Sequence, residues 1–263
     1  MEKADKPAIE REFWDGYVKT PRKLFRRNWY SQTNRYLWAD VMAAVGDIAG
    51  RRVLLVGCGE AARIAKELAA READVWCLDI SPGAIEQLMR HPFGTLAERV
   101  HPVVGDAENM PFGDGFFDLI VGKGIVHHLE VAKFMRELDR VCAPGARIVF
   151  CEPLGTNPVI DLVRYLTPSW RVPTEHPLKP GDIELIRSHC AMLTSRHCEF
   201  LTALSFPWFF LGLKRVGGAV HTLCRAMESG LFRVIPPARW LAWCVILVGR
   251  VPSPKRASEL EKR

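Results

Sequence analysis

Apolar positions follow two different spacings along the middle of the chain. Short apolar runs with little polar alternation, the pattern of strands covered on both faces, occur at 51–56, 74–80, 99–106, 116–122 and 146–152. Segments with apolar residues three or four positions apart, the period of a helix, lie at 61–72, 82–90 and 131–142. Strands that alternate with covering helices pair in parallel. The pattern predicts an α/β fold with a doubly wound, mostly parallel sheet.

The rhythm changes after residue 152. A proline-rich stretch over 153–181 is too long for a plain connection, and such segments are usually functional. We expect a helix over 182–193, a sixth strand over 196–206 and a seventh over 240–251. Residues 207–239 contain the aromatic run PWFF and a basic amphipathic stretch, which together indicate a lid inserted between the last two strands.

Composition limits the class of protein. The 263 residues are 48% hydrophobic and 25% charged, which fits one elaborated globular domain and excludes disordered or collagen-like chains. No apolar run approaches the ~20 residues that span a bilayer, and the N-terminus lacks the apolar stretch of a signal peptide. A cytoplasmic location is therefore expected.

The cysteines do not form a disulfide pattern. Eight are scattered along the chain without a CxxC pair, so we expect reduced, mostly buried thiols. Two His-Cys pairs, His189-Cys190 and His197-Cys198, match no common zinc-ligand spacing. No metal site is expected.

Charge is concentrated at the two ends of the chain. The net charge is +3 over residues 1–27, −4 over 28–206 and +7 over 207–263. A nucleic-acid enzyme would be expected to carry a basic face across its substrate cleft, whereas the central body here is slightly acidic. No nucleic-acid partner is expected.

A glycine turn follows the first predicted strand. Gly57-Cys58-Gly59 allows a ligand to approach the backbone, and the next helix presents free N–H groups at its N-terminus. Together with Ala62 and Asp79, the turn also satisfies a loose dinucleotide-binding fingerprint. The turn alone does not choose between NAD and S-adenosylmethionine.

Several segments in order resemble the class I S-adenosylmethionine-dependent methyltransferases, over residues 50 to 153. They are VLLVGCGEA (53–61), CLDIS (77–81), GDAENMPFGDGFFDLIV (105–121), HHL (127–129) and APGARIVFCEP (143–153). In the region 154–251, the segments EPLGTNP, YLTPSWR and EHPL resemble a bacterial subgroup that methylates small molecules, of the natural-product or quinone type.

The resemblance implies a seven-stranded Rossmann-like sheet with an antiparallel last strand. It divides the chain into an N-terminal helical cover (1–49), the cofactor-binding core (50–153), an acceptor-binding part with the lid insertion (154–251) and a polar tail (252–263). All four parts are expected to belong to a single domain.

The resemblance also implies the cofactor-binding residues: Gly57, Cys58, Gly59, Asp79, Ile80, Asp106, Ala107 and Lys123. Asp79 would accept both ribose hydroxyls, and Asp106 would accept the adenine amino group unless it only forms a turn. Two positions depart from the family pattern: Leu55 replaces the usual acid before the first glycine, and Ala61 replaces a third glycine. Loss of the acid would weaken cofactor binding.

The histidine pair His127-His128 follows the fourth predicted strand, at the edge where open α/β sheets bind ligands. A neutral imidazole can take the proton of a hydroxyl acceptor; alternatively the pair only shapes the site. Glu152 and the pair Glu175-His176 are further polar candidates for acceptor binding.

These observations predict methyl transfer from S-adenosylmethionine to a small lipophilic acceptor, first at oxygen, with carbon and nitrogen as alternatives. A catalytically inactive binding module and an NAD-dependent oxidoreductase are the competing hypotheses. Because apolar and basic residues interleave over 207–239, this segment is also a candidate for contact with a membrane surface. The sequence does not indicate an oligomeric state.

Overall fold

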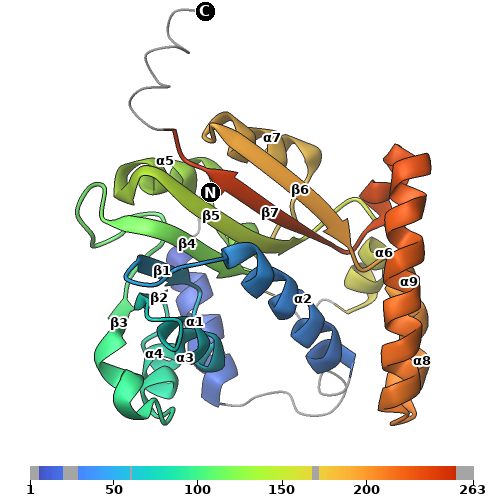
Figure 1. The fold of residues 1–263 in the computed structure, drawn as a ribbon, viewed down its shortest axis with the longest axis horizontal. Coiled ribbons are helices and arrows are strands. Elements are labelled where there is room, and N and C mark those ends of the chain that lie inside the picture. The colour runs from blue at the N-terminus through green and yellow to red at the C-terminus, as the bar shows by residue number, and fades with distance from the viewer. Residues whose placement is uncertain (1–5, 20–28, 60, 168–171, 253–263) are drawn as a thin grey trace, which may run out of the picture.

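The structure, a computed structural model, describes residues 6–19, 29–59, 61–167 and 172–252 (Figure 1). Two helices, α1 (Lys6–Lys19) and α2 (Trp29–Val45), precede the first strand, as expected for the N-terminal cover. Of the expected polar tail, residues 253–263 lie outside the described residues, as do 168–171 of the YLTPSWR segment.

A seven-stranded sheet forms the centre, in the order β3-β2-β1-β4-β5-β7-β6. The first five strands are parallel, and β7 runs antiparallel to both β5 and β6. This confirms the predicted mostly parallel, doubly wound sheet. The strands are β1 (Arg52–Val56), β2 (Asp74–Asp79), β3 (Val100–Val104), β4 (Phe117–Lys123), β5 (Cys142–Pro153), β6 (Met192–Cys198) and β7 (Cys244–Arg250).

Helices cover both faces of the sheet. Successive residues of β1 face opposite cores: Val53 and Leu55 pack with α2, α3 and α4, and Leu54 and Val56 with α5 and α7. This is why the strand is apolar without alternation. The helices are α3 (Ala62–Ala69), α4 (Pro82–Met89), α5 (Val131–Val141) and α7 (Pro180–Ser188), with short 3-10 turns η1 (Gly94–Arg99) and η2 (Val126–His128).

The predicted bounds of the sixth strand are wrong. The strand is Met192–Cys198, and the preceding helix ends at Ser188. Glu199 adopts a left-handed conformation with φ 69°, which a strand cannot continue through. The apolar residues after it, assigned to the strand by their hydrophobicity, instead form the 3-10 turn η4 (Leu201–Ser205).

The segment between β6 and β7 is helical, which confirms an insertion before the last strand. It contains α8 (Phe206–Phe210), the long α9 (Lys214–Val234) and the turn η5 (Pro236–Leu241). The proline-rich excursion after β5 contains a further helix, α6 (Pro158–Leu166), which begins at an Asn157 cap. In Figure 1, α8 and α9 stand at the end of the sheet beside β6 and α6.

Two other expectations concern the cysteines and the membrane. All eight cysteines are free thiols, and all except Cys190 are buried. Among the described residues, no helix combines the length and the apolar character needed to cross a bilayer.

Candidate functional site

A cavity of about 710 Å³ opens at the carboxyl ends of the parallel strands, a volume typical of small-molecule sites. Its floor is formed where β1, β2, β4 and β5 end. This is the edge at which open α/β sheets bind ligands. The predicted residues that line it are Gly57, Gly59, Asp79, Ile80, Asp106, Ala107, Lys123, His127, His128 and Glu175.

The glycine turn has the conformation that the sequence predicted. Gly57 has φ +68°, and a Cβ atom there would lie 3.0 Å from Cδ1 of Ile125. Only glycine fits both the backbone and the space. The Gly59 N–H donates to Oδ2 of Asp79 at 2.9 Å, which ties the turn to the end of β2. Cys58 is fully buried and does not line the cavity, so it holds the turn rather than facing a ligand.

Asp79 anchors two backbone segments. Its Oδ2 accepts from Gly59, and its Oδ1 accepts from the Ser81 N–H at 3.0 Å. Burial raises the pKa of this carboxyl, and the backbone N–H donors of Ser81, Gly59 and Ile80 oppose that rise. Because a carboxylate can accept about four hydrogen bonds, Asp79 keeps some capacity to accept from a ligand hydroxyl.

Asp106 forms a turn and also lines the cavity. Its Oδ1 accepts from the Glu108 N–H at 2.8 Å, so the turn-forming role weighed from the sequence is present. The other carboxylate oxygen can accept a hydrogen bond from a ligand, so forming the turn does not exclude a cofactor-binding role. Ala107 is buried beside it, and Lys123 lies at the end of β4 with its Nζ 5.9 Å from the Trp38 ring centroid.

His127 is held by a buried carboxylate. Its Nδ1 lies 2.8 Å from Oε2 of Glu152. Burial lowers the pKa of the imidazole, and the hydrogen bond that its Nδ1 makes to the Glu152 carboxylate opposes this only in part. Burial acts to raise the pKa of Glu152, but the contact with His127 and the backbone donors outweigh it and the pKa is lowered. Glu152 does not line the cavity, so its role is to position His127.

His128 has a carboxylate partner of its own. Its Nδ1 lies 3.2 Å from Oε2 of Glu10, a residue of α1. Trp14 Nε1 and the Thr174 hydroxyl also donate to Glu10. Burial acts to raise the Glu10 pKa, but the hydrogen bond with His128 and these donors lower it overall. The Nδ1 atom of each imidazole thus lies beside a buried carboxylate of its own.

Glu175 is the third polar side chain at this end of the cavity. Ligand atoms of His127, His128 and Glu175 lie within 4.8 Å of one another, an arrangement that could hold a cation. The expectation of no metal therefore stays a prediction. His176 contributes differently, because its backbone N–H donates to the His127 carbonyl at 2.8 Å.

The two departures from the family pattern have different consequences. Leu55 is 1% exposed inside the core, so this position offers no polar group to a cofactor. Ala61 is the cap residue of α3, makes no side-chain cap, and lines the cavity. The first N–H groups of α3 therefore lack a side-chain partner at the cap.

The acceptor end of the cavity was not predicted in detail. Residues of α1 and α6 form much of its wall, among them Trp14, Ile160 and Val163. None of residues 207–239 lines the cavity, so the lid hypothesis for that segment lacks support. Sequence reasoning missed Glu10 because one acid in a polar helix carries no signal of its distant histidine partner.

Comparisons with known proteins identify the class. Residues 54–150 match the model of the methyltransferase domain family, which covers the glycine turn, Asp79, Asp106 and the histidine pair. This match supports the resemblance to the class I S-adenosylmethionine-dependent methyltransferases that the sequence predicted.

Named relatives are similar over part of their length. The chain is 38% identical over 133 residues to a demethylmenaquinone methyltransferase of Clavibacter sepedonicus, covering 50% of this chain and 52% of that protein. It is 34% identical over 160 residues to ajmaline N-methyltransferase of Rauvolfia serpentina, covering 59% and 50%. The chain spans about half the length of these curated relatives.

Solved structures agree on the fold across nearly the whole chain. A geranyl diphosphate C-methyltransferase from Streptomyces coelicolor A3(2) superimposes with a TM-score of 0.61, covering 95% of this chain and 99% of that one. Because its sequence identity is only 9%, the likeness shows the fold and no more.

Proposed function

We propose that this chain transfers a methyl group from S-adenosylmethionine to an oxygen atom of a small lipophilic acceptor. The observation that carries the proposal is one cavity with two chemically different ends. Glycine and carboxylate groups line one end, and an imidazole pair beside apolar side chains lines the other. Such a cavity brings a polar cofactor and an apolar acceptor together.

The cofactor end fits the adenosyl group and the methionine part. Asp79 would accept from the ribose hydroxyls, Gly57 and Gly59 would admit the methionine part, and Asp106 would face the adenine. Ile80, Ala107 and Lys123 complete this wall, while Cys58 supports it from the core. When bound, S-adenosylmethionine supplies an electrophilic methyl group on a sulfonium.

The imidazole pair is the reason to favour oxygen as the acceptor atom. A hydroxyl must lose its proton as it attacks, and a neutral histidine can take that proton. We assign this role to His128, held by Glu10, and we assign His127 to shaping the site beside it. Named relatives include an N-methyltransferase, so nitrogen and carbon remain the alternatives to be tested.

A lipophilic acceptor follows from the walls at this end. Ile160, Val163 and Val172, with Phe206 and Trp243, offer a large apolar surface to the body of an acceptor, beside charged groups such as Arg164 and Glu175. The demethylmenaquinone methyltransferase among the relatives has a lipophilic substrate in its name, which supports the same class of acceptor.

Thermal unfolding with S-adenosylhomocysteine tests the cofactor assignment. A ligand that binds only the folded state raises the melting temperature, so we expect a rise with S-adenosylhomocysteine and none with NADH. Asp79→Ala should abolish the rise, whereas Glu184→Ala, an exposed substitution on α7, should keep it. A rise with NADH alone would favour the oxidoreductase. A rise without turnover on any acceptor panel would favour the inactive binding module.

A further inference from the structure

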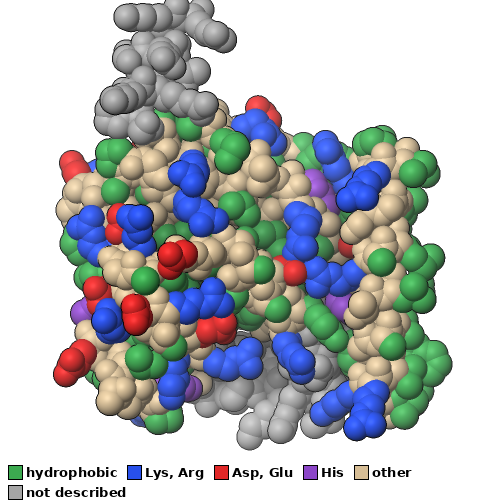
Figure 2. All heavy atoms as spheres, viewed as in Figure 1, with side chains coloured by type: hydrophobic (Ala, Val, Ile, Leu, Met, Phe, Trp, Pro, Cys, Tyr) green, Lys and Arg blue, Asp and Glu red, His purple; other side chains and the backbone are tan. Residues whose placement is uncertain are grey.

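Helix α9 is apolar on the side that faces solvent. Val216, Leu223, Met227 and Val234 are 42%, 62%, 57% and 81% exposed. Their spacing of seven, four and seven residues places them on one stripe. The stripe runs along a helix of 21 residues, which is about 31 Å long. Figure 2 shows hydrophobic side chains along this outer edge of the molecule.

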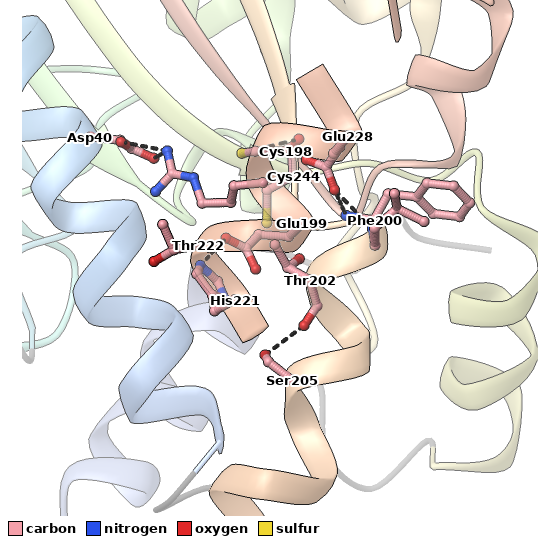
Figure 3. Close-up of polar contacts among 12 residues, drawn as sticks. Asp40, Cys198, Glu199, Phe200, Thr202, Ser205, His221, Thr222, Glu228 and Cys244 are labelled. Carbon is pink, nitrogen blue, oxygen red and sulfur yellow. Dashed lines mark hydrogen bonds and ion pairs between the residues drawn. The ribbon is translucent and has the colours of Figure 1, made fainter. Parts of the chain in front are cut away.

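The buried side of α9 is polar instead. Its buried residues are Gly217, His221, Cys224 and Glu228. Figure 3 shows His221 directed at Glu199 and Glu228 directed at the backbone of Phe200. The Phe200 N–H donates to Oε2 of Glu228 at 2.6 Å. A helix of a globular protein normally has the opposite arrangement. The apolar stripe is therefore not explained by the packing of the described residues.

The apolar surface continues over the neighbouring helices. Phe210 and Leu211, at the end of α8, are 62% and 67% exposed. Helix α6 has no buried residue, and Leu162 and Leu166 face solvent. The start of α6 is tied to the turn after α9, because Thr156 Oγ1 donates to the Trp240 carbonyl at 2.6 Å. Exposed apolar side chains gathered on neighbouring helices in this way are typical of an interaction site.

The same helices form the wall of the cavity. Ile160 and Val163 of α6 and Phe206 of α8 line it, while other residues of those two helices are exposed on the outer side. These two helices therefore contribute residues both to the cavity wall and to the outer surface.

Charge distinguishes between the partners that could cover this surface. Between residues 206 and 241 the exposed charged side chains are Lys214, Arg215, Arg233 and Arg239, all basic, and the one acid in this segment, Glu228, is buried. A second copy related by two-fold symmetry would bring these like charges together, which costs binding energy. An anionic lipid surface offers the opposite charge together with an apolar layer.

We propose that α8, α9 and the outer side of α6 dock on an anionic phospholipid bilayer, from which the acceptor enters the cavity. The docking surface is defined as Leu162, Leu166, Phe210, Leu211, Val216, Leu223, Met227 and Val234. The part of this inference that concerns the acceptor, a lipophilic molecule dissolved in the membrane, rests on the proposed function. The docking itself stands on the exposed surface and its charges.

Vesicle sedimentation of the full chain tests the docking. Phosphatidylcholine vesicles with one third phosphatidylglycerol should sediment the protein at about 50 mM salt, and less of it at high salt, where charge is screened. Pure phosphatidylcholine vesicles should sediment less. Replacing Leu223 and Met227 together by serine should weaken binding by about tenfold or more. Lys214→Glu with Arg215→Glu should weaken it only for anionic vesicles.

The matched control is Met89→Ser, which changes a methionine of similar exposure (64%) at the end of α4. This variant should bind vesicles as the parent does. No sedimentation at low salt, or an equal loss with Met89→Ser, would overturn the proposal. A different result would also overturn it: the parent protein is a dimer in analytical ultracentrifugation, the double variant at Leu223 and Met227 is a monomer, and neither protein binds vesicles. S-adenosylhomocysteine binding is a separate readout, and its absence in the parent protein would overturn the proposed function instead.

Discussion

The carboxylate of Glu152 holds the ring of His127 and the backbone of the same turn at once. Oε2 lies 2.8 Å from His127 Nδ1, while Oε1 accepts from the N–H groups of Ile125 and Val126 at 3.0 and 3.1 Å. Glu152 is at the end of β5, and the turn follows β4, so one buried charge fixes two neighbouring strand ends. The orientation of His127 therefore depends on a residue outside the cavity.

Glu152→Gln is expected to destabilise the fold and to disorder the histidine pair. The amide would place a donor against backbone N–H donors and leave His127 without a charged partner. Breaking a fully buried ionic contact costs about 3 to 5 kcal/mol, and some of the hydrogen bonds survive, so we expect about 2 to 4 kcal/mol from urea unfolding. Glu175→Gln, which changes a half-buried carboxylate in the cavity, should cost less than about 1 kcal/mol. Equal losses in both variants would show that Glu152 has no special structural role.

His128→Ala is expected to lower turnover more than His127→Ala. The difference should be largest below the pKa of the acceptor hydroxyl, where a base is needed. Glu10→Gln should give an intermediate loss, since it only positions His128. The measurement is the pH profile of kcat for each variant, with S-adenosylhomocysteine binding as the control for folding. Equal, pH-independent losses would mean that methyl transfer depends on alignment alone.

A chelator separates an imidazole base from a bound cation. If His128 acts as the base, EDTA should leave turnover unchanged. Turnover that falls with EDTA and returns with a divalent ion would instead place a cation between His127, His128 and Glu175.

The sequence predicted the strands of the core because their apolar runs are bounded by glycine and charged residues. The glycine turn and Asp79 follow neighbouring parallel strands, so the sequence placed both at one edge of the sheet. The 2.9 Å hydrogen bond between the Gly59 N–H and Asp79 confirms that they meet. The sixth strand was misplaced because hydrophobicity does not reveal that Glu199 takes a left-handed conformation. Local pattern cannot report a backbone torsion that tertiary packing imposes.

Long-range polar pairs were the other limit. Glu10 lies 118 residues before its partner His128, and nothing in the periodicity of α1 distinguishes it from the other acids of that helix. The sequence also did not predict which side of α9 faces the protein interior. Its sequence is amphipathic, but only the structure shows that His221 and Glu228 are buried while Leu223 and Met227 face solvent.

The adjacent phenylalanines of α8, Phe209 and Phe210, are expected to contribute very differently to the stability of the fold. Phe209 is 3% exposed, and a Cβ on Gly217 would lie 2.8 Å from its ring, so these two residues are packed together. Phe209→Ser should cost about 3 to 5 kcal/mol, by the usual range for a buried phenylalanine. Phe210→Ser, at an exposed position, should change stability by about 0.5 kcal/mol or less. Urea unfolding measures both, and equal costs would contradict the packing described here.

Glu199 is a buried acid with several ionisable side chains close to it. His221 Nε2 lies 3.6 Å from its Oε1, and Glu228, Arg225 and Asp40 also act on it. Burial raises the Glu199 pKa to about 7, although the nearby Thr202 hydroxyl opposes the rise. The neutral carboxyl is therefore favoured in the folded protein over much of the acidic range.

Glu199→Gln is expected to stabilise the protein in a pH-dependent way. The pKa is about 7 in the folded state against a reference of 4.5, so the folded chain binds the extra proton between these values. Stability from this group is fully present below the reference value and is lost as pH rises through about 7. Glutamine cannot ionise, so its advantage over the parent should be small at about pH 5 and larger at about pH 8. His197, with a pKa lowered to about 4 by burial and Arg239, destabilises both proteins alike at low pH and cancels in the difference. The urea midpoints of the two proteins measure the effect, with the exposed substitution Glu184→Gln as the control. An advantage that stays constant between the two pH values would show that Glu199 is not neutral in the folded protein.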